Sequence, residues 1–172
     1  RRLLIGCSLR DIGRRVLPSV EDLLVAVGSP PTLAVLAKIT WPSLKRVHIT
    51  FSVIDDIDVS STLAEIVLQM PRVEHLSLRR WMTGYDDEVA PRDSLASSIL
   101  ETLRGGGNGL RRLDLEIGLS SAGAEALIAP IRLLPPSLRL HLPKRAIADA
   151  ALRSKYARDL GVVFDDEPDR QD

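Results

Sequence analysis

Aromatic residues make up only 3% of this 172-residue chain, cysteine occurs once, and the formal net charge is zero. A single thiol, Cys7, excludes an internal disulfide, and no metal-ligand spacing surrounds it. The balance of 23 basic and 23 acidic residues gives no overall attraction to nucleic acid or to anionic lipid. No apolar run approaches the roughly 18 residues that would cross a bilayer. We therefore expect an intracellular, cytoplasmic protein that binds no nucleic acid and inserts into no membrane.

In place of aromatics, the chain has aliphatic residues in a recurring phrase, apolar-x-x-apolar-x-apolar. Copies occur at Leu44/Val47/Ile49, Val73/Leu76/Leu78 and Leu110/Leu113/Leu115, a shortened copy at Leu138/Leu140/Leu142, and Leu3 and Ile5 fit the last two places. Such short alternating runs predict strands. The first residues of successive copies are 29, 37 and 28 positions apart. A recurrence at this interval is typical of repeat proteins, so we predict one strand in each repeat.

Segments between the copies carry apolar residues at helical spacing. Helices are predicted near residues 60–70, from Asp93 or Ser94 to residue 103, over 124–131 with a cap at Ser120 or Ser121, and over 145–158. Strand and helix therefore alternate along the chain.

The N-terminal 42 residues are longer than the other units. Ser19 and Asp22 resemble a capping box, and the apolar residues from Val20 to Val27 predict a helix that ends at Gly28. A second short helix is predicted through Leu36. We interpret residues 1–42 as an expanded first repeat.

The remaining chain fits one domain over residues 1–164. Residues 81–91, WMTGYDDEVAP, lack periodicity and are predicted to be a loop insertion. Residues 145–164, with a strand at 160–164, are expected to cap the C-terminal end. Residues 165–172 are acidic, contain no apolar residue, and are predicted to be disordered.

Two sets of residues carry a family resemblance. Residues 110–128, LRRLDLEIGLSSAGAEALI, resemble a unit of the ribonuclease-inhibitor-like class of leucine-rich repeats, and PSLKRVHI and PRVEHLSL resemble F-box leucine-rich-repeat proteins. The resemblance implies an α/β solenoid of about five degenerate repeats, with a parallel sheet on the concave side and helices on the convex side. The chain departs from the family at the position of its usual Asn, where Ser52, Trp81 and Gly118 stand.

Residues between the apolar places would face outward on the sheet. Three columns result: Arg2, Arg46, His75, Arg112 and Arg139; then Leu4, His48, Ser77, Asp114 and His141; then Thr50, Arg79 and Glu116. The first column predicts a basic ridge that binds an acidic protein surface. The alternative is a solvated sheet surface in which Asp114, Glu74 and Glu116 neutralise the arginines.

These columns and the insertion supply the candidate binding residues. We select Arg46, His48, His75, Arg79, Trp81, Tyr85, Arg112, Asp114, Arg139 and His141. His48 and His141 would lie three strands apart, about 14 Å, so one ion cannot hold all three histidines and we predict no metal site.

Catalytic and cofactor motifs are equally weak. The glycine-rich stretch 105–109 follows a predicted helix and precedes a strand, which is the reverse of a phosphate-binding loop. We predict no enzyme activity and no cofactor.

The leading hypothesis is non-enzymatic protein recognition through the concave sheet and the 81–91 insertion. The resemblance to F-box proteins implies one alternative, the substrate receptor of a ubiquitin ligase. A structural subunit of a large assembly is another, and a small phosphorelay-type antagonist domain is a further alternative, suggested only by the Ser-Ala-Gly motif of residues 121–123.

Overall fold

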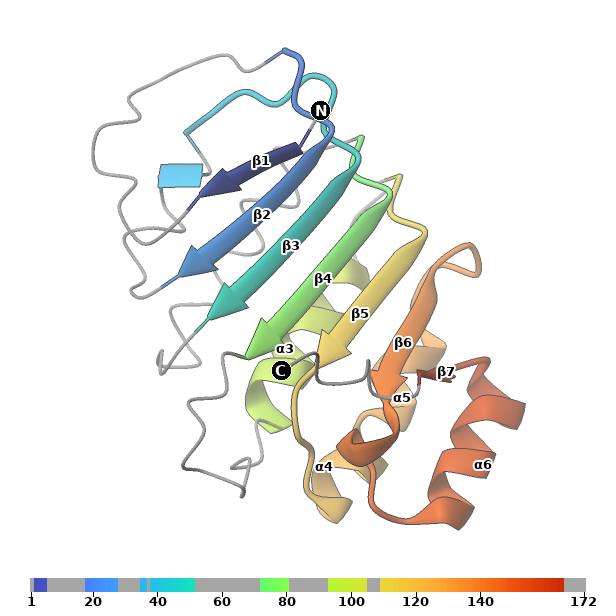
Figure 1. Cartoon of the computed structure of the whole chain (residues 1–172). Coiled ribbons are helices and arrows are strands. Elements are labelled where there is room, and N and C mark those ends of the chain that lie inside the picture. The colour runs from blue at the N-terminus through green and yellow to red at the C-terminus, as the bar shows by residue number, and fades with distance from the viewer. Residues whose placement is uncertain are drawn as a thin grey trace, which may run out of the picture.

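A computed structural model of the chain describes residues 2–5, 18–27, 35–36, 38–51, 72–80, 93–104 and 109–165. They contain one seven-stranded, all-parallel sheet whose strands follow one another in chain order (Figure 1). Its strands are β1 (Arg2–Ile5), β2 (Asp22–Val27), β3 (Arg46–Phe51), β4 (His75–Arg80), β5 (Arg112–Glu116), β6 (Arg139–Pro143) and β7 (Val163–Asp165). The predicted α/β class with a parallel sheet is confirmed.

Helices follow the later strands. They are α3 (Asp93–Arg104), α4 (Ser121–Ala126), α5 (Ile128–Arg132), the short 3-10 helix η1 (Lys144–Ala146) and α6 (Ala150–Leu160). The helices predicted near 93–103 and 124–131 are confirmed, the second as two short helices. The helix predicted over 145–158 begins later, at Ala150, after η1. The helix predicted over 60–70 lies outside the described residues.

The helix predicted between Ser19 and Gly28 is wrong. Residues Asp22–Val27 form β2, which is hydrogen-bonded between β1 and β3. Val20, Leu23 and Val25 are a further copy of the apolar phrase, starting 24 residues before Leu44, and all three are buried. Their spacing is compatible with both a helix and a strand, and pairing with strands on both sides favours the strand. The first 42 residues therefore contribute two strands to the sheet.

The apolar places of the phrase line up across the sheet. Leu23, Val47, Leu76, Leu113 and Leu140 occupy matching positions on β2 to β6, and each is buried. Val25, Ile49, Leu78 and Leu115 form the next buried row. Each buried aliphatic side chain of this size contributes about 1.5–3 kcal/mol relative to exposure. The core is thus a stack of aliphatic layers, as the scarcity of aromatics implied.

Successive strands also begin in the same way. The amides of Lys45 and Arg46 both donate to the carbonyl of Glu21, at 2.9 and 3.0 Å. The amides of Glu74 and His75 likewise share the carbonyl of Lys45, at 2.8 and 3.0 Å. The amides of Arg111 and Arg112 share that of Glu74, at 2.8 and 3.0 Å. Because this pattern repeats from β2 to β5, equivalent residues occupy matching positions along neighbouring strands.

The C-terminal helices are joined by specific contacts. Pro130 has no N–H, and its ring would clash with the carbonyl of Ala126 in a continuous helix, so α4 ends there and α5 begins at Ile128. The hydroxyl of Tyr156 in α6 donates to the carbonyl of Ala124 in α4, and Tyr156 is fully buried. Gly161, at φ +64°, then ends α6 in the left-handed conformation that favours glycine.

The last described strand changes two predicted boundaries. It begins at Val163 and not at residue 160, because α6 continues through Leu160. We assigned Asp165 to the acidic tail, whereas it is the last residue of β7 and pairs with Pro143. Residues 166–172 lie outside the described part of the chain. None of the helices in the described ranges is long and apolar enough to span a membrane.

Candidate functional site

One face of the sheet carries the polar side chains that stand between the buried apolar rows. Helices α3 and α5 lie behind the sheet in Figure 1, on the side opposite to these polar side chains. We call the polar side the open face. Its first column is Arg2, Asp22, Arg46, His75, Arg112 and Arg139, in register from β1 to β6. The predicted order of this column is confirmed, with Asp22 as an additional member.

Asp22 was missed because its segment was assigned to a helix. It faces Arg46 across β2 and β3, where Arg46 Nη2 donates to Asp22 Oδ2 at 2.7 Å and Nε donates to Oδ1. The hydrogen bonds from Arg46 lower the pKa of Asp22 below its usual value and raise that of Arg46. The signal that identifies Asp22 is its place directly before Leu23, the second apolar residue of its phrase.

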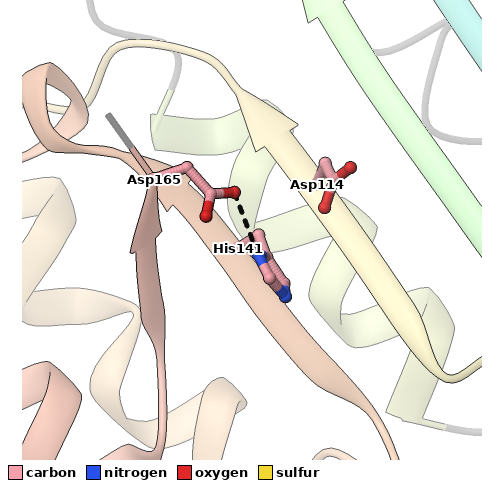
Figure 2. A group of neighbouring side chains, drawn as sticks. All are labelled: Asp114, His141 and Asp165. Carbon is pink, nitrogen blue, oxygen red and sulfur yellow. Dashed lines mark hydrogen bonds and ion pairs between the residues drawn. The ribbon is translucent and has the colours of Figure 1, made fainter. Parts of the chain in front are cut away.

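Three ligand-type side chains converge near the last strands of the open face. Asp114 on β5, His141 on β6 and Asp165 on β7 each offer one nitrogen or oxygen, and these atoms lie within 4.8 Å of one another (Figure 2). His141 Nδ1 and Asp165 Oδ2 are 2.9 Å apart. The side chains of Asp114 and His141 are only 15% and 13% exposed. We call these residues the Asp-His-Asp cluster.

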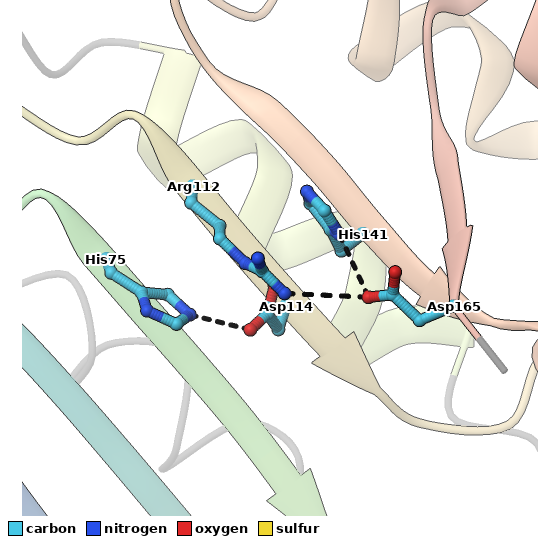
Figure 3. A network of polar contacts seen from close by, with 5 residues as sticks. All are labelled: His75, Arg112, Asp114, His141 and Asp165. Atoms are coloured by element: carbon cyan, nitrogen blue, oxygen red, sulfur yellow. Dashed lines mark hydrogen bonds and ion pairs between the residues drawn. The ribbon is translucent and has the colours of Figure 1, made fainter. Parts of the chain in front are cut away.

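Arg112 and His75 extend this cluster into a polar network. Arg112 Nε donates to Asp114 Oδ1 at 2.7 Å, and its Nη2 lies 3.6 Å from Asp165 Oδ2 (Figure 3). His75 Nε2 lies 2.6 Å from Asp114 Oδ2. Burial acts to raise the pKa of Asp114, but the contacts with His75 and Arg112 outweigh it and leave that pKa below its usual value. Asp114 is therefore ionised at neutral pH and held at both oxygens.

The three histidines form two separate groups. The rings of His48 and His75 meet edge to face, with centroids 5.2 Å apart, whereas His141 lies on β6 with β5 between it and β4. Burial, followed by the neighbouring His75, lowers the pKa of His48. His48 is therefore neutral at pH 7. The strand spacing that excludes a site of three histidines does not exclude one of His141 with the carboxylates of Asp114 and Asp165.

Acidic groups interleave with the arginines of the open face. Arg79 pairs with Glu116 at 3.0 Å across β4 and β5, as the predicted columns require. The described residues of this face hold five arginines, Arg2, Arg46, Arg79, Arg112 and Arg139, and four carboxylates, Asp22, Asp114, Glu116 and Asp165. The face is therefore nearly balanced in charge, and the arginines do not form an uncompensated basic ridge.

Arg139 differs from Arg46 and Arg112, the ion-paired arginines of the first column. It makes no ion pair with any residue in the described ranges, and one of its terminal nitrogens lies 3.6 Å from the position a Cβ would take at Gly161. Arg139 also lines a hollow of about 300 Å³ beside Leu138 and Leu160. Its guanidinium is thus available to a partner group without breaking an existing ion pair.

The remaining predicted residues fall in two places. Glu74, predicted to neutralise the arginine column, instead lies at the starting edge of the strands, where Glu21, Lys45, Glu74 and Arg111 line a groove of about 390 Å³. Trp81 and Tyr85, with the whole 81–91 insertion, lie outside the described residues.

Comparisons with family models, with curated proteins and with solved structures find no match to this chain. The functional conclusion therefore depends on the open face itself.

Proposed function

We propose that this chain is a non-enzymatic protein-recognition scaffold of the leucine-rich-repeat solenoid type, which binds a partner protein through the open face. Support for the repeat architecture comes from five copies of the apolar phrase in one register, at Leu23, Val47, Leu76, Leu113 and Leu140. The strand starts, in which two amides share one carbonyl, recur in the same way. Stacked strand and helix units of this kind bury a continuous core between neighbours.

The observation that carries the binding function is the polarity of the open face. All-parallel sheets are usually covered on both faces, and their strands are then apolar on both sides. Here every second residue of β3, β4 and β5 is polar, and ordered columns of Arg, His and Asp stand where a second helical layer would pack. Such a face suits contact with another protein through charged and hydrogen-bonding groups.

The intramolecular ion pairs do not prevent such contact. Arg46 and Arg112 have side chains 55% and 44% exposed. Exposed ion pairs contribute only about 0–1 kcal/mol, so exchanging an internal carboxylate for one of a partner costs little. Arg139 needs no exchange at all. We therefore propose that the partner presents an acidic surface to the open face. We expect Trp81 and Tyr85 of the insertion to add apolar contacts at the edge of this interface.

The experiment compares two matched sets of substitutions. The face variant carries Arg46→Gln, Arg112→Gln and Arg139→Gln, because Glu at these positions would repel Asp22, Asp114 and Asp165. The control variant carries Arg104→Gln, Arg132→Gln and Arg158→Gln, which removes the same charge from exposed arginines of α3, α5 and α6. Each tagged protein is incubated with an extract of the source organism, and bound proteins are quantified by mass spectrometry.

The proposal predicts that wild type and control recover the same proteins and that the face variant loses them. Circular dichroism confirms that both variants are folded. Equal recovery by the folded face variant and the control contradicts binding through the open face.

A further inference from the structure

The Asp-His-Asp cluster brings together three side chains that can each bind a metal ion, a property that protein recognition does not require. We propose that Asp114, His141 and Asp165 bind a divalent transition-metal ion, with Zn²⁺ as the test ion. The three residues come from successive strands, β5, β6 and β7, and their ligand atoms lie within 4.8 Å of one another. In a tetrahedral site with bonds of about 2.0–2.2 Å, ligand atoms are about 3.4 Å apart. Modest side-chain rotations therefore close the cluster around one ion.

The donor set favours a transition metal over a hard cation. One imidazole nitrogen with two carboxylate oxygens is a combination that Zn²⁺ accepts, whereas Mg²⁺ and Ca²⁺ prefer oxygen alone. Three protein ligands would leave one position for water. Figure 2 shows the side chains of Asp165 and His141 in contact and that of Asp114 on the neighbouring strand, all on the open face.

The charge of the cluster also favours a cation. Both carboxylates of the cluster, those of Asp114 and Asp165, lie beside a single guanidinium, that of Arg112. A divalent ion between the two carboxylates would be attracted by both of them.

Arg112 is a competitor for the same carboxylates. Its Nε donates a hydrogen bond to Oδ1 of Asp114 at 2.7 Å, and its Nη2 lies 3.6 Å from Oδ2 of Asp165 (Figure 3). A bound ion must displace this guanidinium, whose side chain is 44% exposed and free to move toward solvent. Removing Arg112 is therefore expected to tighten metal binding.

His75 contributes from outside the ligand set. Its Nε2 lies 2.6 Å from Asp114 Oδ2, so this contact fixes the carboxylate while Oδ1 turns to the ion. Outer contacts of this type usually change metal affinity by about 10–100-fold. His75 is a positioning residue in this arrangement.

The test titrates the chelator-treated full chain with Zn²⁺ by calorimetry and with Co²⁺ by visible absorption, which distinguishes a tetrahedral site from a hydrated ion. We expect His141→Ala and Asp165→Asn each to weaken Zn²⁺ binding by at least about tenfold. Arg112→Met tightens binding, and the double variant Arg112→Met/His141→Ala loses the gain. The side chain of Asp165 is 48% exposed and does not belong to the core, so Asp165→Asn leaves the buried rows intact.

Two substitutions serve as matched controls. Glu101→Gln removes an exposed carboxylate of α3, and Asp169→Asn removes a carboxylate of the acidic C-terminal residues. Both are expected to bind Zn²⁺ as wild type does. Unchanged affinity in His141→Ala and Asp165→Asn, or a gain in Arg112→Met that persists without His141, overturns the proposed site.

Discussion

Asp22 on β2 and Arg46 on β3 stand directly opposite each other and form an ion pair through two atoms on each side. The contact links β2, which the sequence had predicted as a helix, to Arg46 of the predicted first column. It also places an acidic residue between Arg2 and Arg46 in that column, which reduces the repulsion between these two arginines. The open face is therefore a set of compensated charges held in register.

The first prediction concerns this pair. Since Arg46 lowers the pKa of Asp22, the Asp22 carboxyl in the folded wild type titrates below its usual value of 3.8, and Arg46→Gln returns it toward that value. A lowered carboxyl pKa contributes stability above the unfolded value and loses it as the pH falls through the folded one. Carbon-detected NMR of the carboxyl resonance measures both pKa values. Identical titration in the two proteins would show that the pair does not persist in solution.

The second prediction concerns Gly123 at the start of α4. A Cβ added there would lie 1.9 Å from the carboxyl group of Asp93, which accepts a hydrogen bond from the Ser120 amide at 2.9 Å and a second from the Ser120 hydroxyl. Gly123→Ala therefore forces Asp93 away from the cap of α4 and lowers the free energy of unfolding by about 1–3 kcal/mol. Urea denaturation measures the change.

A double-mutant cycle supplies the control for Gly123. In an Asp93→Ala background the obstructing carboxyl group is gone, so Gly123→Ala is expected to cost much less. An equal cost in both backgrounds would refute the proposed clash.

The third prediction concerns Tyr156, which is 0% exposed. Its hydroxyl donates to the carbonyl of Ala124, so Tyr156→Phe leaves that buried acceptor without this donor and lowers the free energy of unfolding by about 1–3 kcal/mol. Thermal denaturation of wild type and variant measures the difference. Tyr85→Phe, the only other tyrosine change that the chain offers, is the matched control and is expected to have a smaller effect.

A fourth prediction is the response of the same group to alkali. Burial, and to a smaller degree Glu125, raises the pKa of Tyr156 to about 12. A group whose pKa is raised on folding contributes stability below its unfolded value near 10 and loses it as the pH rises toward 12. In the Tyr85→Phe protein, ultraviolet absorption then reports Tyr156 alone. Ionisation near 10 in the folded protein would contradict its burial.

Five of the seven strands were predicted from the recurring apolar phrase, and a further strand was predicted near β7. The phrase predicts strands well because a shift of one residue in register would move every apolar side chain from the buried face to the exposed one. The sequence did not predict β2, since Val20, Leu23 and Leu24 satisfy helical spacing as well, and only pairing with β1 and β3 decides between them. Tertiary contacts overrode the local pattern there.

The candidate site was predicted in part for a similar reason. The columns through Arg46, Arg112 and Asp114 follow from alternation along each strand, and the cross-strand pair of Arg79 with Glu116 follows from the register. Asp165 had no such signal, because its position depends on β7 returning beside β6 after α6. The convergence of Asp165 with His141 and Asp114 is visible only in three dimensions.

Binding of a protein partner by the open face can be tested by the affinity of that partner, once captured, for three proteins. Surface plasmon resonance compares wild type, the face variant of Arg46, Arg112 and Arg139, and the control variant of Arg104, Arg132 and Arg158. If the partner binds through the open face, the face variant binds it at least about tenfold more weakly, equivalent to about 1.4 kcal/mol, and the control binds it as wild type does. Equal affinity for all three proteins would contradict binding through this face.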